Sequence, residues 1–228
     1  MRHNGPIEMT PPAATIAIAG ERLQLLPQRA VYWPAQRMLL IADAHFGKAA
    51  RFRMHGVPVP GGTTESNLQV IDSLLECCAV ERLLFLGDFT HGRLDADSAT
   101  LKRLARWRAA HGELSVELVI GNHDRSSGAL PEALAIATRT EPYDIGPFSL
   151  CHHPEVRGGG YVLAGHLHPV VKLYGRGHDR ARAPCFVFGQ HAALLPAFGA
   201  FTGGLNIERQ ADDRIWVIAG DSVLALPR

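Results

Sequence analysis

The sequence predicts an α/β fold with a mixed sheet system, and three observations lead to this prediction. Short apolar runs typical of buried strands recur along the 228 residues. In the first half these runs alternate with two segments of helical spacing, and a strand–helix–strand order favours parallel pairing because the crossover is long. The second half is rich in strands and turns, which favours antiparallel pairs beside the parallel ones.

The core is expected to begin and end with similar hairpins. Residues 15–19 and 23–26 flank Gly20-Glu21, and residues 215–219 and 223–226 flank Gly220-Asp221. A glycine-first pair suits a tight hairpin turn. Two independent hairpins that use the same turn chemistry account for the similarity better than a duplicated unit does.

Strands and helices are predicted between the two hairpins. Six apolar runs are interpreted as strands: residues 38–42, 83–86, 116–120, 148–150, 161–164 and 186–188. A helix is predicted to begin at Thr63 or Thr64, followed by apolar residues at three- and four-residue steps: Leu68, Ile71, Leu75 and Cys78. A second helix is predicted after Asp95 and Asp97 from the similar spacing of Leu94, Leu101, Leu104 and Trp107. Pro131 suits the first position of a short third helix.

Length and composition predict one domain, residues 14–228, behind a flexible N-terminus of residues 1–13. A net charge of +1 does not suggest a nucleic-acid coat protein or a membrane-surface protein, although a local basic patch could still exist. The first twelve residues lack the apolar core of a signal peptide, and no later run approaches the ~20 residues of a membrane span. We therefore expect a cytoplasmic protein without membrane contact whose four cysteines are reduced thiols.

Five polar clusters follow the ends of predicted strands. They are Asp43-Ala44-His45, Gly87-Asp88, Gly121-Asn122-His123-Asp124, His152 and Gly165-His166-Leu167-His168. Ligands of open α/β sheets bind at the carboxyl ends of the strands, so we expect these clusters to converge. The first and last clusters each hold ligands two residues apart, which project to the same side of an extended chain. A mixed His/Asp/Asn set suits manganese, iron or zinc in a hydrolytic site.

This ordered set resembles the calcineurin-like metallophosphoesterase superfamily, which carries DxH, GD, GNHD, a lone His and GHxH along the chain. Further stretches narrow the resemblance to the bacterial ligase-associated DNA damage response endonuclease family (PdeM type): Tyr32-Trp33-Pro34, Phe46-Gly47-Lys48, residues 55–60, Arg157 with its glycines, and residues 195–204. The resemblance implies a four-layer α/β/β/α sandwich of two mixed sheets flanked by helices. It also implies two divalent metal ions, with Mn²⁺ preferred over Fe or Zn, and a role in DNA repair beside an ATP-dependent DNA ligase and a helicase.

The resemblance also assigns roles to the clustered residues. Asp43, His45 and His168 would bind the first metal, and Asn122, His152 and His166 the second. Asp88 would bridge the two metals, and His123 would face the substrate. Cys151-His152-His153 offers two imidazoles at the fourth motif. His152 is preferred because it follows the strand directly, and His153 is then expected to point the other way.

Charge and geometry predict a mechanism for such a centre. Two divalent cations and two carboxylates leave about +2, which a bridging hydroxide and one phosphodiester would neutralise. Metals ≈3.5–4 Å apart can activate a bridging water for in-line attack. His123 would protonate the leaving oxygen, while Asp124 would either orient a histidine or cap a helix.

Several basic residues are candidates to contact the substrate beyond the metals. Lys48, Arg51 and His91 could touch flanking phosphates, or Lys48 and Arg51 could solvate a loop and His91 could support the ligands. Arg176, Arg180 and Arg182 could form another edge of a nucleic-acid groove. No stacking platform of interleaved aromatic residues is visible in the sequence.

The leading functional prediction is a dinuclear-metal phosphodiesterase that cuts DNA, internally or from its ends. A second interpretation keeps the centre and changes the substrate to a nucleotide or another small phosphoester, because fold does not choose among substrates. A third is a non-catalytic scaffold that recruits the ligase or helicase. The sequence leaves self-association as a homodimer open.

Overall fold

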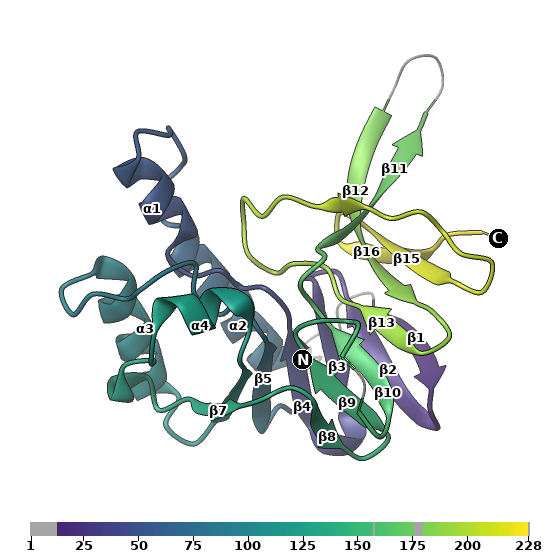
Figure 1. The fold of residues 1–228 in the computed structure, drawn as a ribbon, viewed down its shortest axis with the longest axis horizontal. Helices are drawn as coiled ribbons and strands as arrows, with labels where there is room; N and C mark the ends of the chain where they lie inside the picture. Colours follow the sequence, from purple (N-terminus) through teal and green to yellow (C-terminus); the bar gives the residue numbers. More distant parts are fainter. Residues whose placement is uncertain (1–12, 157, 176–179, 228) are drawn as a thin grey trace, which may run out of the picture.

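A computed structural model describes residues 13–156, 158–175 and 180–227. Within these residues the chain folds into two β-sheets with helices beside them (Figure 1). The predicted flexible N-terminus lies outside the described residues except for Ala13, and so do Arg157 and Arg176.

The first sheet holds the strands that lead to the first three polar clusters. Its order is β1-β2-β3-β4-β5-β6-β7. Four strands pair antiparallel in sequence: β1 (Ala14–Ile18), β2 (Glu21–Leu26), β3 (Ala30–Trp33) and β4 (Met38–Ile41). Three more continue the sheet in parallel: β5 (Arg82–Leu86), β6 (Ser115–Val119) and β7 (Ala137–Arg139). The sheet is therefore mixed, and β4, β5 and β6 end at the same edge.

The second sheet is also mixed, with the order β14-β11-β12-β13-β10-β9-β8. Its strands are β8 (Tyr143–Ile145), β9 (Phe148–Cys151), β10 (Tyr161–Ala164), β11 (Pro169–Tyr174), β12 (Arg180–Phe188), β13 (Ala192–Leu194) and β14 (Leu205–Asn206). A C-terminal hairpin of β15 (Arg214–Ala219) and β16 (Ser222–Ala225) pairs with β12. The far ends of β11 and β12 project from the body of the molecule (Figure 1).

The helices belong to the first half of the chain. They are α1 (Lys48–Met54), α2 (Thr63–Cys77), α3 (Ala99–Ala110), α4 (Asn122–Ser127) and the 3₁₀ turns η1 (Pro34–Gln36) and η2 (Glu132–Leu134). The α-helices gather on one side of the sheets in Figure 1. The predicted α/β class with two mixed sheets and flanking helices is thus confirmed. In the described part of the chain no helix follows Ala135, so the helices flank the sandwich from the side of the first sheet.

Strand β4 shows how the core is divided. All four of its residues are fully buried, which explains its continuous apolar run. Met38 and Leu40 join the core between the sheets, where Trp33 packs edge-on against Phe148 with ring centroids 4.9 Å apart. Leu39 and the alternate residues of β4 and β5 face α2 and α3 in a second core. Burial on both faces holds the ends of β4 and β5 in place.

The predicted elements agree with the structure except in a few places. All six predicted strands and both hairpins are present, and α2 begins at Thr63. The second helix starts only at Ala99, because the Ser98 side chain accepts a hydrogen bond from the backbone N–H of Leu101 and caps it there. Helix α1 was not predicted, since only Ala49 of its residues is buried and no apolar period marks it.

Two further expectations concern thiols and membranes. None of Cys77, Cys78, Cys151 and Cys185 forms a disulfide in the described structure, as expected, but Cys77 is exposed and does not belong to the core. Among the described residues, no helix combines the length and the apolar character that crossing a bilayer requires.

Candidate metal centre

The five polar clusters meet where the carboxyl ends of strands from both sheets come together. Asp43, Asp88 and Asn122 follow β4, β5 and β6 of the first sheet, while His152 and His166 follow β9 and β10 of the second. Among the described residues, possible ligand atoms lie within 4.8 Å of one another in four overlapping groups: Asp43/His45/His168, Asp43/Asp88/His152, His152/His153/His166 and His45/His91/His123. The structure therefore brings together the residues that the sequence indicated as metal ligands.

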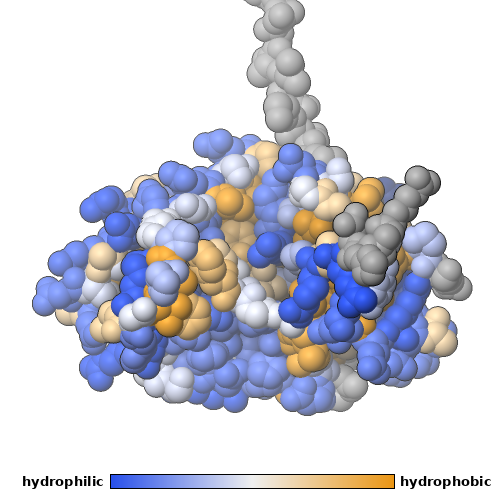
Figure 2. Space-filling view, turned by 90° about the horizontal axis from the view of Figure 1, so that it is seen from above, coloured by the Kyte–Doolittle hydropathy of each residue, from blue (hydrophilic) through white to orange (hydrophobic). Residues whose placement is uncertain are grey.

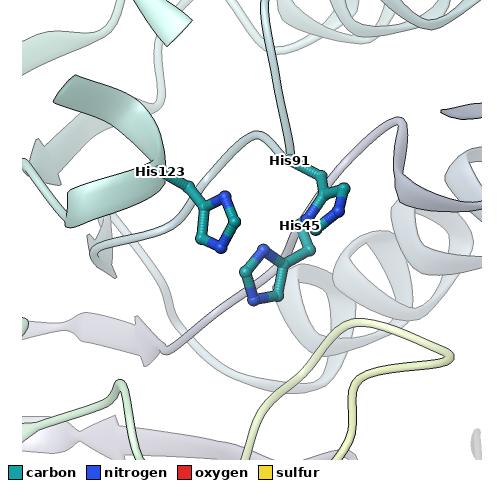
Figure 3. A group of neighbouring side chains, drawn as sticks. All are labelled: His45, His91 and His123. Atoms are coloured by element: carbon teal, nitrogen blue, oxygen red, sulfur yellow. The ribbon is translucent and has the colours of Figure 1, made fainter. Parts of the chain in front are cut away.

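One end of this centre is a group of three imidazoles. Figure 3 shows the rings of His45, His91 and His123 turned toward a common space. The ring centroids of His45 and His123 are 5.1 Å apart, and those of His91 and His123 are 4.8 Å apart. The His123 side chain is 36% exposed and its Nε2 lies 3.9 Å from Asp88 Oδ2, so it is open to a substrate as well as to the centre.

The opposite end gathers acceptor atoms at hydrogen-bond distance. His152 Nδ1 lies 3.1 Å from the carbonyl oxygen of Leu86, so we assign the ring proton to Nδ1. Nε2 of the same ring then presents its lone pair 2.9 Å from Asn122 Oδ1, 3.1 Å from His166 Nδ1 and 3.4 Å from Asp88 Oδ1. Several acceptors facing one point are the arrangement that a cation satisfies.

Five of the residues that form the centre adopt left-handed backbone conformations. The φ angles are 53° at Asp43, 46° at His45, 49° at Asp88, 68° at His166 and 48° at His168. Such angles are uncommon for residues with a Cβ and cluster at functional sites. Hydrogen bonds hold them: the backbone N–H of His45 donates to Asp88 O at 2.9 Å, and that of His166 donates to Asp43 Oδ2 at 2.9 Å. The bends turn the side chains into the centre.

The glycines of these clusters permit close packing around the carboxylates. A Cβ on Gly121 would lie 2.4 Å from Asp88 Oδ1, and one on Gly165 would lie 2.5 Å from Asp43 Oδ2. At Gly87, where φ is 80°, a Cβ would overlap the ring of His152. From the sequence, we expect the glycines before Asp88, Asn122 and His166 to permit sharp turns of the backbone. At Gly121 and Gly165, where φ is not positive, the requirement is space.

The electrostatics of the centre fit bound metal ions. Asp43 Oδ1, both ring nitrogens of His45 and Nδ1 of His91 are buried without a hydrogen-bond partner in the described structure. Burial lowers the pKa of His45 to about 2, and the nearby Lys48 charge adds to this. Burial also lowers the pKa of His91 to about 4 and that of His166 below its usual value. A buried nitrogen or oxygen atom without a partner lowers the stability of the fold. A bound metal would accept the lone pairs of these atoms, and neutral imidazoles are the form of histidine that binds a metal.

Glu141 was not recognised from the sequence, yet it organises one side of the centre. Its carboxylate accepts hydrogen bonds from the backbone N–H groups of His152 and His153, both at 2.9 Å, and from Arg125 at 2.9 Å. Burial raises the pKa of Glu141, but the hydrogen bonds from His153 and the adjacent backbone lower it overall, which keeps the carboxylate ionised. Nothing in the sequence marks this residue, because it stands alone between two short strands.

The expectation for His153 was wrong. It was expected to point away from the centre, but its ring centroid lies 4.5 Å from that of His166. Its Nδ1 is 2.7 Å from Glu141 Oε1, which turns the ring back over the loop. His152 still makes the contacts with Asn122 and Asp88, so His153 lies beside the centre as an additional imidazole.

Asp124 has the geometry of the helix-capping alternative. One carboxylate oxygen accepts the backbone N–H of Gly121 at 3.0 Å, and the other accepts that of Thr90 at 3.2 Å. Burial raises the pKa of Asp124, and the two backbone bonds oppose this rise. The carboxylate thus ties the loop after β5 to the start of α4.

The candidate substrate contacts lie on or beside α1. Lys48 is half-buried, and burial lowers its pKa against the opposing influence of Asp43 and Asp88. The Arg51 side chain packs so closely on Gly92 that a Cβ there would lie 2.3 Å from Nη1. A cavity of about 270 Å³ opens between α1 and the loop after His91, and Arg51 and Arg93 are among its lining residues. Lys48 and Arg51 lie on a helix, so the alternative in which they solvate a loop does not hold.

Comparisons with known proteins place this geometry in context. No protein-family model matches the chain, and no curated protein matches it. Among solved structures, the chain is similar to the crystal structure of Pseudomonas putida nuclease MPE, with 42% sequence identity and a TM-score of 0.83. The match covers 94% of this chain and 100% of the other.

Proposed function

We propose that this chain, which belongs to the same family as the Pseudomonas putida nuclease MPE, is a metal-dependent nuclease that hydrolyses phosphodiester bonds in DNA. The observation that carries the proposal is the convergence of two carboxylates, one amide and several neutral imidazoles on one point, with buried polar atoms left unpaired. The sequence resemblance supports DNA repair beside an ATP-dependent DNA ligase and a helicase as the cellular role.

The residues divide into two ligand sets. Asp43, His45 and His168 would hold a first divalent cation, and Asn122, His152 and His166 a second. Asp88 would serve both, because Oδ2 lies 3.8 Å from His45 Nε2 while Oδ1 lies 3.4 Å from His152 Nε2. The mixed nitrogen and oxygen donors support Mn²⁺, with iron or zinc as alternatives.

A bound pair of such ions would supply an activated water and neutralise the charge of the phosphate. The chain's own side chains set the remaining conditions. Asp43 and Asp88 contribute only two negative charges, so a centre loaded with two divalent ions would keep about +2 and attract a phosphodiester anion. His123, partly exposed at the rim, would donate a proton to the leaving oxygen, a contribution worth roughly 10²–10⁴-fold in rate.

Cations outside the ligand set would position the substrate. On α1, Lys48 lies near Asp43, Asp88 and His45, and Arg51 lies near His91, which in turn packs against His45 and His123. We assign them to the phosphates that flank the scissile bond, where a charged donor is most effective.

The test is hydrolysis by the purified protein, with and without Mn²⁺, of DNA and of a small chromogenic phosphodiester. Both substrates should be cut only with the metal present, and Asp88→Ala should lower the rate by at least about 10³-fold, since both ligand sets lose a shared carboxylate. Glu76→Ala removes an exposed carboxylate on α2 and serves as the control. Equal rates for the wild type and Asp88→Ala, or no cleavage with any divalent metal, would end the proposal.

A further inference from the structure

Strands β11 and β12 form a two-stranded ribbon whose outer part carries a concentrated set of cations around one exposed aromatic ring. We propose that this ribbon, residues 169–174 and 180–184, is an arm that binds the strand of single-stranded DNA leading to the metal centre. The proposal rests on the nuclease function above and adds the surface that holds the substrate.

The register of the ribbon places four polar side chains on one face. Tyr174 pairs with Arg180, and Lys172 pairs with Arg182. Cross-strand partners share a face, and so do residues two apart along a strand, so these four side chains project together. All four are exposed, and the Tyr174 residue is 71% exposed.

The opposite face of the ribbon is used for packing. Val171 and Ala183, which are cross-strand partners, are buried in a small core with residues of β15. The ribbon is therefore anchored from behind by this core. A cationic face supported in this way can meet a ligand without exposing the core.

The chemistry of this face fits a polyanion with accessible bases. Neither strand contains Asp or Glu, and the described structure pairs none of Lys172, Arg180 and Arg182 with a carboxylate. Arg180 Cζ lies 6.0 Å from the centroid of the Tyr174 ring, which combines an aromatic surface with a charge. Aromatic rings beside cations bind single strands by stacking on bases while the cations contact phosphates. Stacking of this kind requires an unpaired base.

The arm is continuous with the centre. β11 begins at Pro169, directly after His168. Tyr174 lies six residues after His168, which corresponds to about 20 Å along an extended strand. Two consecutive carbonyls link the two regions: His168 Nδ1 contacts Gly203 O at 3.2 Å, and the Arg182 guanidinium donates to Gly204 O. A strand bound along the arm would therefore reach the centre past Arg182.

Figure 2 views the molecule from the side on which the arm projects, and hydrophobic residues form separate patches among hydrophilic ones there. The sequence alone does not predict this face, because Tyr174 and Arg180 become neighbours only through the pairing of β11 with β12.

Binding without metal isolates the arm from catalysis. The measurement is fluorescence anisotropy of a labelled oligothymidine of about 20 nucleotides in EDTA at several salt concentrations. Lys172→Glu with Arg180→Glu should weaken binding at least about tenfold and reduce the salt slope by about 1.4, the value for two lost phosphate contacts. Tyr174→Ala should weaken binding by about 5- to 150-fold with little change in slope, and Tyr174→Phe should retain most of the affinity.

Matched controls separate the arm from general charge and from folding. Lys102→Glu with Arg103→Glu makes the same charge change on α3 and should leave the affinity within about twofold. With Mn²⁺, the arm variants should cleave the small chromogenic phosphodiester at the wild-type rate while kcat/KM on DNA falls in step with binding. Arm variants that bind the oligonucleotide like the wild type, or that lose only duplex binding, would overturn the proposal. If the wild type hydrolyses neither substrate, the proposed nuclease function is wrong. The binding measurement in EDTA still tests whether the arm binds single-stranded DNA.

Discussion

The two sheets contribute unlike halves to the metal centre. The first sheet supplies both carboxylates and the amide, and its loops are fixed by backbone hydrogen bonds, such as Phe46 N–H to Phe89 O at 2.8 Å and His91 N–H to Phe46 O at 3.1 Å. The second sheet supplies imidazoles, and Glu141 holds the loop after β9 through its side chain. Backbone hydrogen bonds thus hold the half from the first sheet. The half from the second sheet depends on side chains such as Glu141, which a single substitution can remove.

The largest effect should come from crowding the half that the backbone fixes. In Gly121→Ala the new Cβ would lie 2.4 Å from Asp88 Oδ1 and 2.5 Å from its backbone nitrogen, so Asp88 must move. We expect activity to fall at least about 10²-fold, since small misplacements of catalytic groups are that costly. Gly112→Ala is the control, because no atom lies within 4 Å of its Cβ position. Equal activity in both variants would show that the close approach is unimportant.

The next effect should come from releasing the half that side chains hold. Glu141→Ala removes the acceptor for His152, His153 and Arg125 and should lower Mn²⁺ affinity at the second ligand set by about 10–100-fold. Calorimetric titration with Mn²⁺ measures this directly, and Glu141→Gln should recover part of the affinity through its amide oxygen. Glu81→Ala, which removes an exposed partner of Arg37, should change nothing. An unaltered isotherm for Glu141→Ala would remove its positioning role.

Acid should destabilise the metal-free protein through its buried imidazoles. The pKa of His45 is lowered to about 2 and that of His91 to about 4, so the unfolded chain binds protons that the folded chain does not. Stability is therefore fully present above the unfolded pKa near 6.5 and falls as the pH drops below it. Each such histidine contributes at most about 1.4 kcal/mol per pH unit. Urea unfolding in EDTA between pH 7.5 and 5 measures the slope, and His45→Gln should flatten it.

The smallest effect on activity is expected at Asp124. Its two backbone hydrogen bonds make it a cap, so Asp124→Asn should cost about 1 kcal/mol of unfolding free energy and change the rate by less than about threefold. Thermal unfolding and the chromogenic assay check the two values. A rate loss above tenfold without loss of stability would restore the alternative in which this carboxylate orients a histidine.

The sequence predicted the strands that end at the centre because each is a continuous apolar run followed by a polar cluster. Asp43, Asp88, Asn122 and His166 could be placed together for this reason. Glu141 could not, since its partners come from three separate segments and no local pattern records such contacts. The short helix α1 was missed because it buries only Ala49. The pairing of Tyr174 with Arg180 was missed because cross-strand neighbours leave no trace in sequence order.

The left-handed backbone at the ligand residues has a consequence for the evolution of this fold. Asp43, Asp88 and His168 occupy φ angles that glycine adopts freely and other residues resist. Replacement by glycine should therefore cost the fold less than replacement by alanine, even though either one removes a ligand. A chain released from selection for chemistry could gain thermal stability by giving up its ligands, so the non-glycine residues at these bends of this chain favour reactivity over stability.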